Sequence, residues 1–173
     1  MSKDRLESSY FEVAPDAKKP FLVETRNQTL QVLGTKFNIS AYTNEIITTT
    51  LVQGCVNLTN STTMLQQQLV PGEQAFIDSK SNKWQVKKVD VEDVIAWTKG
   101  MFVFNDQSLE QVMGKLERWY DVKVVYSDEA AKKIVFKGNL PRNLDLKTVL
   151  SMIERISSAS FDMQENQVNV KVK

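Results

Sequence analysis

The sequence predicts an all-β domain, a roll or sandwich of short antiparallel strands, followed by a small α+β domain. From Tyr10 to about Val89, short runs rich in β-branched and aromatic residues follow one another without a helical period. Beyond that region, apolar residues recur at helical spacing, with strand-like runs between the helical segments. We therefore expect an all-β domain in residues 1–93, a linker in 94–100 and an α+β domain in 101–173.

Three strand-like runs of the first region end on a glycine. VLG, LVQG and LVPG end at Gly34, Gly54 and Gly72, which are 20 and 18 residues apart. This spacing fits a sheet wound back on itself, with a turn closing each circuit. The first glycine lies inside VLGTKFNIS, where Phe37 and Ile39 alternate as in a strand. Because glycine weakens a strand interior, either the backbone bends there or another segment approaches it closely.

The second region predicts the element order β-α-β-β-α-β-β, with two helices covering one sheet face. Ser108 followed by Gln111 forms an expected capping box for the first helix. Asn143 or Asp145 is the candidate cap of the second helix. The apolar positions expected on the inner faces of the two helices are Leu109, Val112, Met113, Leu116 and Trp119 or Tyr120, then Leu146, Val149, Leu150 and Ile153.

The composition excludes several classes of function. The 22 basic and 21 acidic residues lie in no long block of one sign, so no nucleic-acid partner is expected. The chain has no histidine, which removes Ser-His-Asp and Cys-His catalysis and histidine zinc sites. Cys55 is the only cysteine, and we expect a small core side chain there. We predict no cofactor and no metal, and no apolar run approaches the roughly 20 residues that a membrane-spanning helix needs.

The carboxyl-terminal run QVNVKVK is a candidate partner-binding strand. Apolar residues alternate with polar ones, which predicts one buried and one soluble face. At a sheet edge, such a strand could accept a partner's strand through main-chain hydrogen bonds. Alternatively, its lysines protect the edge against pairing. The candidate residues are Val168, Asn169, Val170, Lys171 and Val172.

Four aromatic residues, Trp97, Phe102, Phe104 and Trp119, could form a ligand-stacking platform. Phe102 and Phe104, however, share one strand face, and Trp119 completes a helix face. We therefore expect core packing for these side chains rather than a binding surface.

The order of the motifs resembles that of a known family over nearly the whole chain, from about Ser9 to Val170. The chain resembles the periplasmic region of FecR-type anti-sigma factors, and its C-terminal unit resembles the STN module of secretins and TonB-dependent receptors. In that family, further β motifs precede YFEV, so the first domain is expected to be truncated at its N-terminus. The strings that carry the resemblance are YFEV, PFLVET, VLGTKFNISAY, TTTLVQGCV, LVPGEQA, IAWTKGMFVFNDQSLEQVMGKLERWYDVKV and FKGNL.

The resemblance implies a regulatory role that depends on binding rather than on enzymatic turnover. The implied partner is the signaling domain of an outer-membrane TonB-dependent transducer. The signal would reach an extracytoplasmic-function sigma factor through a cytoplasmic segment absent from this chain, beyond a single membrane helix, and this region would lie in the periplasm. The inducing ligand, an iron chelate or a glycan, is not identified. The alternative is a periplasmic carbohydrate-binding or envelope-assembly module.

Some members of the family cleave themselves at a Gly-Thr bond, and Gly34-Thr35 stands at the matching position. In this chemistry the threonine hydroxyl attacks the preceding carbonyl in an N-to-O acyl shift, and water then hydrolyses the ester. The reaction demands no histidine. The alternative is a structural glycine at a bulge, followed by a β-favouring threonine.

Overall fold

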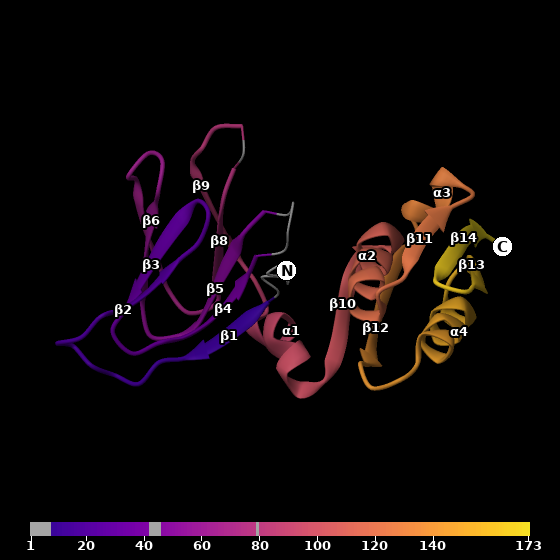
Figure 1. Cartoon of the computed structure of the whole chain (residues 1–173), viewed down its shortest axis with the longest axis horizontal. Coiled ribbons are helices and arrows are strands. Elements are labelled where there is room, and N and C mark those ends of the chain that lie inside the picture. Colours follow the sequence, from indigo (N-terminus) through magenta and orange to yellow (C-terminus); the bar gives the residue numbers. More distant parts are fainter. Residues whose placement is uncertain (1–7, 42–45, 79) are drawn as a thin grey trace. The chain divides into compact units, whose positions relative to one another are not determined.

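A computed structural model describes residues 8–41, 46–78 and 80–173, and the chain divides into two compact units (Figure 1). The first unit ends at Ile95, and the second spans Ala96–Lys173. The segment expected as a linker contains the end of helix α1 (Val91–Ile95) and a 3-10 helix, η1 (Ala96–Lys99). Among the described residues, no helix is long and apolar enough to cross a membrane.

The first unit is a sandwich of two antiparallel sheets, which confirms the predicted fold class. One sheet has the strand order β1-β4-β5-β8-β9, and the other has the order β2-β3-β6-β7 (Figure 1). The strands are β1 (Ser9–Glu12), β2 (Phe21–Glu24), β3 (Gln28–Val32), β4 (Lys36–Ser40), β5 (Thr48–Gln53), β6 (Val56–Asn60), β7 (Gln66–Leu69), β8 (Glu73–Ile77) and β9 (Trp84–Lys88).

Apolar side chains from both sheets form the core of the sandwich. They include Leu30, Val32, Phe37, Ile39, Leu51, Val56, Leu58, Leu69 and Ala75. A polar link crosses this core, because Nε2 of Gln28 donates to Oγ1 of Thr49 at 2.9 Å. The two residues belong to different sheets and are both buried, so the bond supplies partners to buried polar groups while joining the layers.

The three glycines that end VLG, LVQG and LVPG mark the points where the chain passes between the sheets. They lie between β3 and β4, between β5 and β6, and between β7 and β8. Gly34, Gly54 and Gly72 have φ angles of +144°, +94° and +89°, a region that side chains other than glycine rarely adopt. VLGTKFNIS is therefore two strands joined by a crossing.

The bulge suggested for Gly34 lies elsewhere. The pairing of β4 with β5 shifts register between Lys36 and Phe37, and the extra residue belongs to β5. Gly34 lies before the start of β4, so it serves the crossing rather than the bulge.

The second unit confirms the predicted α+β class but has two sheets where one was expected. β10 pairs with β12, whereas β14 lies between β11 and β13. The parallel pairing of β11 with β14 places β11 in the second sheet, apart from β10 and β12. The elements are β10 (Met101–Ser108), α2 (Leu109–Tyr120), β11 (Lys123–Tyr126), α3 (Glu129–Lys132), β12 (Val135–Pro141), α4 (Leu146–Ile156), β13 (Ala159–Gln164) and β14 (Gln167–Val172). The predicted order lacks the short helix α3, and it also lacks η1 at the start of the unit.

The two long helices of the second unit, α2 and α4, begin at predicted caps. Ser108 and Gln111 form the capping box of α2, and the side chain of Asp145 accepts from the backbone N–H of Thr148 at the start of α4. The inner faces of the helices share one core with both sheets. Eight of the helix positions predicted for the inner faces are buried: Leu109, Val112, Met113, Leu116, Leu146, Val149, Leu150 and Ile153. At the ninth, Trp119 is exposed and Tyr120 is only partly buried.

Candidate functional site

The bond between Gly34 and Thr35 lies at a crowded corner of the first unit. Thr35 and Val13 exchange both backbone hydrogen bonds, at 3.0 and 3.1 Å, which extends the pairing of β1 with β4. Thr35 is 3% exposed. Its hydroxyl Oγ1 donates to the carbonyl oxygen of Cys55 at 2.8 Å. Thr35 is therefore held by two segments: by Val13, which follows β1, and by Cys55, which lies between β5 and β6.

Two backbone segments approach this bond so closely that side chains are excluded. A Cβ atom added to Gly34 would lie 2.5 Å from Cα of Pro15. A Cβ atom added to Gly54 would lie 2.7 Å from the carbonyl oxygen of Gly34 and 3.0 Å from Oγ1 of Thr35. The sequence suggested that another segment approaches Gly34 closely, and Pro15 does so. Gly54, at the crossing from β5 to β6, approaches the same bond from another segment.

The hydrogen bond of Thr35 bears on the self-cleavage hypothesis. In the acyl shift, the hydroxyl oxygen attacks the carbonyl carbon of Gly34 and gives up its proton to a base. Here the hydroxyl donates to the neutral carbonyl of Cys55, which is not a base of useful strength. In this geometry the hydroxyl stabilises the corner. Cleavage would require it to leave Cys55 and turn toward Gly34, and self-cleavage stays a prediction.

We expect Thr35→Val to lower the free energy of unfolding by about 1–3 kcal/mol, because the carbonyl of Cys55 loses its donor. Thr35→Ser keeps the hydroxyl and should retain most of the stability. Chemical denaturation measures both variants. The same proteins, incubated and run on a denaturing gel, test cleavage, since fragments 1–34 and 35–173 must be absent from Thr35→Val. Fragments that persist in this variant would rule out attack by the hydroxyl.

The expectation that Cys55 fills the core is wrong. Cys55 is exposed, and its sulfur accepts a contact from Nε2 of Gln68 at 2.8 Å. The next residue, Val56, begins β6 and points into the core. Successive strand side chains point to opposite faces, so Cys55 is directed outward.

The expectation that the last strand forms a sheet edge is also wrong. β14 is the middle strand of its sheet and pairs in parallel with β11 and antiparallel with β13. Its ladder is therefore occupied on both sides along Gln167–Val170. The candidate residues are Val168, Asn169, Val170, Lys171 and Val172. Val168 and Val170 are buried in the core, and Lys171 and Val172 pair with β13 alone. The strand-addition argument for this segment loses its basis.

Among the aromatic residues, the prediction of core packing is confirmed for Phe102 and Phe104 but not for Trp119. The indole of Trp119 is 47% exposed. The guanidinium carbon of Arg142 lies 3.8 Å from the centroid of the Trp119 ring and 4.7 Å from that of Phe102. Nε1 of Trp119 donates to the carbonyl oxygen of Arg142 at 3.2 Å. The result is a braced, half-exposed cation-π pair.

Sequence reasoning missed Arg142, because it lies in the segment between β12 and α4, far along the chain from Trp119. No local pattern pairs the two residues. In the described part of the chain, no group of three or more His, Cys, Asp or Glu residues is placed to hold a metal.

Comparison with known proteins places these features in context. Residues 101–170 match the family model described as FecR, C-terminal. Two crystal structures of a protein assigned as an anti-sigma factor from Parabacteroides distasonis ATCC 8503 superpose with TM-scores of 0.80 and 0.79 at 25% sequence identity, covering 96% of this chain and 78% of that chain. No curated protein gives a significant sequence match. Residues 101–170 therefore match a FecR C-terminal domain, and the chain as a whole has the fold of a protein assigned as an anti-sigma factor.

Proposed function

We propose that this chain is the periplasmic sensor region of an anti-sigma factor and binds the signaling domain of an outer-membrane TonB-dependent transducer. The observation that carries the proposal is the likeness to the Parabacteroides protein, which extends over both units in the same order, combined with the FecR C-terminal match. In this proposal, binding is relayed through a membrane helix to a cytoplasmic sigma factor. The signal is a change in conformation or in susceptibility to proteolysis.

We infer that the chain acts by binding a protein partner and not by catalysing a reaction on a separate substrate. The one reactive element suggested by the sequence, Gly34-Thr35, would act on its own chain and not on a separate substrate. The second unit, which we propose as STN-like, offers a surface suited to a protein partner. Trp119 is half-exposed and braced by Arg142, and tryptophan and arginine are enriched among residues that dominate binding energy. We take Trp119 as the anchor of this interface.

The test is calorimetric titration of the chain with the purified signaling domain of a TonB-dependent transducer from the same organism. We expect saturable binding, weakened roughly tenfold or more in Trp119→Ala because an interfacial tryptophan contributes about 2 kcal/mol or more. Met152→Ala, at a partly exposed position of α4, is the matched control and should bind normally. Thermal unfolding of each variant verifies that the fold is intact.

Two results would contradict different parts of the proposal. Absence of binding at high micromolar concentration would remove the transducer as partner. Normal binding by a folded Trp119→Ala variant would move the interface elsewhere on the chain.

The alternative, a carbohydrate-binding or envelope-assembly module, would be favoured by a concave aromatic groove. Phe37, Phe104 and Phe136 are buried instead, in the cores of the two units. Burial of these rings opposes a stacking surface built from them, because a sugar needs access to the ring face.

A further inference from the structure

Strand β9 (Trp84–Lys88) is the edge of the five-stranded sheet in the first unit. Within the described ranges, it pairs with β8 on one side and has no strand on the other. Figure 1 shows β8 and β9 as a long hairpin that rises from the sandwich. A strand in this position presents a row of unpaired backbone donors and acceptors.

The hydrogen bonds at the two ends of the hairpin show which backbone groups face outward. The N–H of Asp78 donates to the carbonyl of Lys83 at 2.9 Å, and the N–H of Val89 donates to the carbonyl of Gly72 at 2.9 Å. Bonding alternates along an antiparallel pair, so every second residue of β9 faces β8. The residues whose N–H and C=O groups point away from β8 are Trp84, Val86 and Lys88.

The side chains along this edge differ between the two sheet faces. Val86 lies opposite Ala75, and Trp84 lies opposite Ile77. Both partners are buried, so Trp84 and Val86 are on the inner face of the sheet. Val86 is nevertheless 39% exposed, since no further strand covers it. Lys83, Gln85 and Lys87 alternate with these residues and lie on the outer face.

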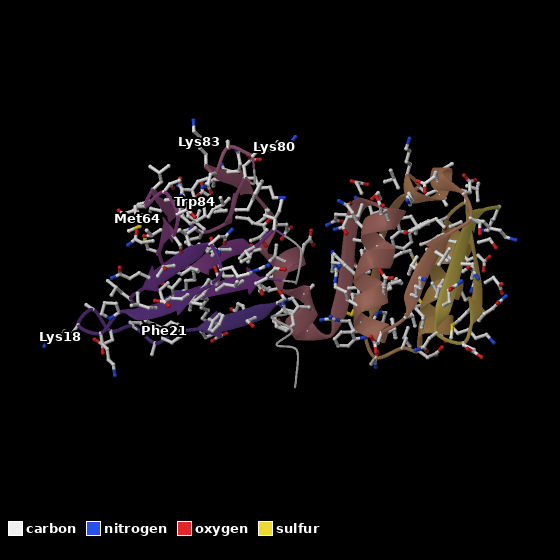
Figure 2. The ribbon with its side chains drawn as sticks, turned by 45° about the horizontal axis from the view of Figure 1, so that its top comes forward. Lys18, Phe21, Met64, Lys80, Lys83 and Trp84 are labelled. Carbon is white, nitrogen blue, oxygen red and sulfur yellow. The ribbon has the colours of Figure 1, made fainter. Side chains whose placement is uncertain are left out.

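The edge carries net positive charge, although Glu73 of β8 lies opposite Lys88. Residues 80–89 contain four lysines and no acidic residue. None of the four forms an ion pair with any residue that the structure describes. In Figure 2, Lys80 and Lys83 extend away from the ribbon at the hairpin tip. Like charges repel a second copy of this edge, whereas a strand that carries carboxylates is complementary to it.

The hairpin is held in place before any partner arrives. Nε1 of Trp84 donates to the carbonyl of Leu65 at 3.0 Å, which ties the start of β9 to the β6–β7 turn. Asp78 accepts from the backbone N–H and the hydroxyl of Ser81, at 2.7 Å each, and these bonds hold the pKa of Asp78 below its usual value. A preorganised edge loses little conformational freedom on binding.

We propose that β9 is a docking edge for an extended acidic peptide segment, which adds to the sheet as a further strand. Its backbone pairs with the outward groups of Trp84, Val86 and Lys88. Its carboxylates alternate with small apolar residues, so that the acids lie beside Lys83 and Lys87 on the outer face and the apolar residues cover Val86 on the inner face. This site lies in the first unit and is separate from the Trp119 interface proposed above.

The test uses a fluorescent heptapeptide of alternating Glu and Val, titrated into the chain and followed by anisotropy at low salt. We expect saturable binding of this peptide and none of the matching Lys-Val peptide. Methylating the alternate amide nitrogens that would face β9 should weaken binding about tenfold or more, because each methyl group removes a donor and blocks the strand's approach. Equal binding of the methylated peptide would show attraction by charge alone and overturn the proposal.

Variants of the protein locate the site. Lys87→Glu should weaken binding of the Glu-Val peptide about tenfold. Lys18→Glu, on the loop between β1 and β2 and labelled in Figure 2, makes the same change of charge elsewhere and should have little effect on peptide binding.

Val86→Pro removes an outward N–H without breaking the pairing with β8. It should also weaken peptide binding, in a protein shown by circular dichroism to be folded. If Val86→Pro does not fold, the methylated peptide makes the same test. Equal losses in Lys18→Glu and Lys87→Glu would overturn the proposal.

Discussion

Gly34→Ala should lower the free energy of unfolding of the first unit by about 2–6 kcal/mol, because two separate costs combine. The φ angle of +144° is one that alanine adopts only under strain. The added methyl group would also lie 2.5 Å from Cα of Pro15, which is backbone and cannot turn aside. The crossing from β3 to β4 would have to move, and with it the bonds that hold Thr35.

Gly72→Ala is the matched control for this substitution. Gly72 has a φ angle of +89°, at another crossing between the same sheets, but a Cβ atom there would meet nothing within 4 Å. It should carry only the backbone cost, about 1–2 kcal/mol. Equilibrium urea denaturation followed by circular dichroism compares the two variants. If both variants lose the same free energy of unfolding, the close approach of Pro15 to Gly34 does not contribute to the cost of the substitution.

Phe104→Ala should lower the free energy of unfolding of the second unit by about 3–5 kcal/mol. The ring of Phe104 is fully buried on β10. Its centroid lies 5.9 Å from the Phe102 ring and 5.7 Å from the Phe136 ring. Truncation removes these contacts and leaves a cavity in the core that the strands and helices of the second unit share.

Val135→Ala tests whether burial is the cause of that loss. Val135 belongs to β12, the strand that pairs with β10, but its side chain is 65% exposed. Its truncation should cost less than about 1 kcal/mol, since little apolar surface returns to water. The two variants are compared by chemical denaturation. A Phe104→Ala protein as stable as Val135→Ala would contradict the assignment of Phe104 to the centre of the core.

Local patterns were sufficient to predict most elements of the chain. Runs rich in β-branched and aromatic residues predicted the strands of the sandwich, and helical spacing predicted α2 and α4 with most of their buried faces. The capping box of Ser108 and Gln111 was readable because both residues belong to one turn. These signals depend on residues a few positions apart, where the backbone geometry is nearly the same in every protein.

Two of the predictions that proved wrong depend on contacts between distant segments. An alternating strand reads the same at an edge as in the middle of a sheet, so QVNVKVK could not show that β14 lies between two partners while β9 has only one. Trp119 completes an apolar helix pattern, yet it is half-exposed and packs against Arg142, which comes from a distant segment.

VLGTKFNIS shows the same division within nine residues. The sequence by itself determined that Gly34 interrupts an alternating run and that the backbone bends there or is approached closely. Only the tertiary structure decided that both are true. The chain changes sheets at Gly34, and Pro15 lies against this glycine, while Gly54 lies against the carbonyl oxygen of Gly34. The physical reason is that a bend is a property of one residue's backbone angles, whereas the neighbours that fill the space around it come from elsewhere in the chain.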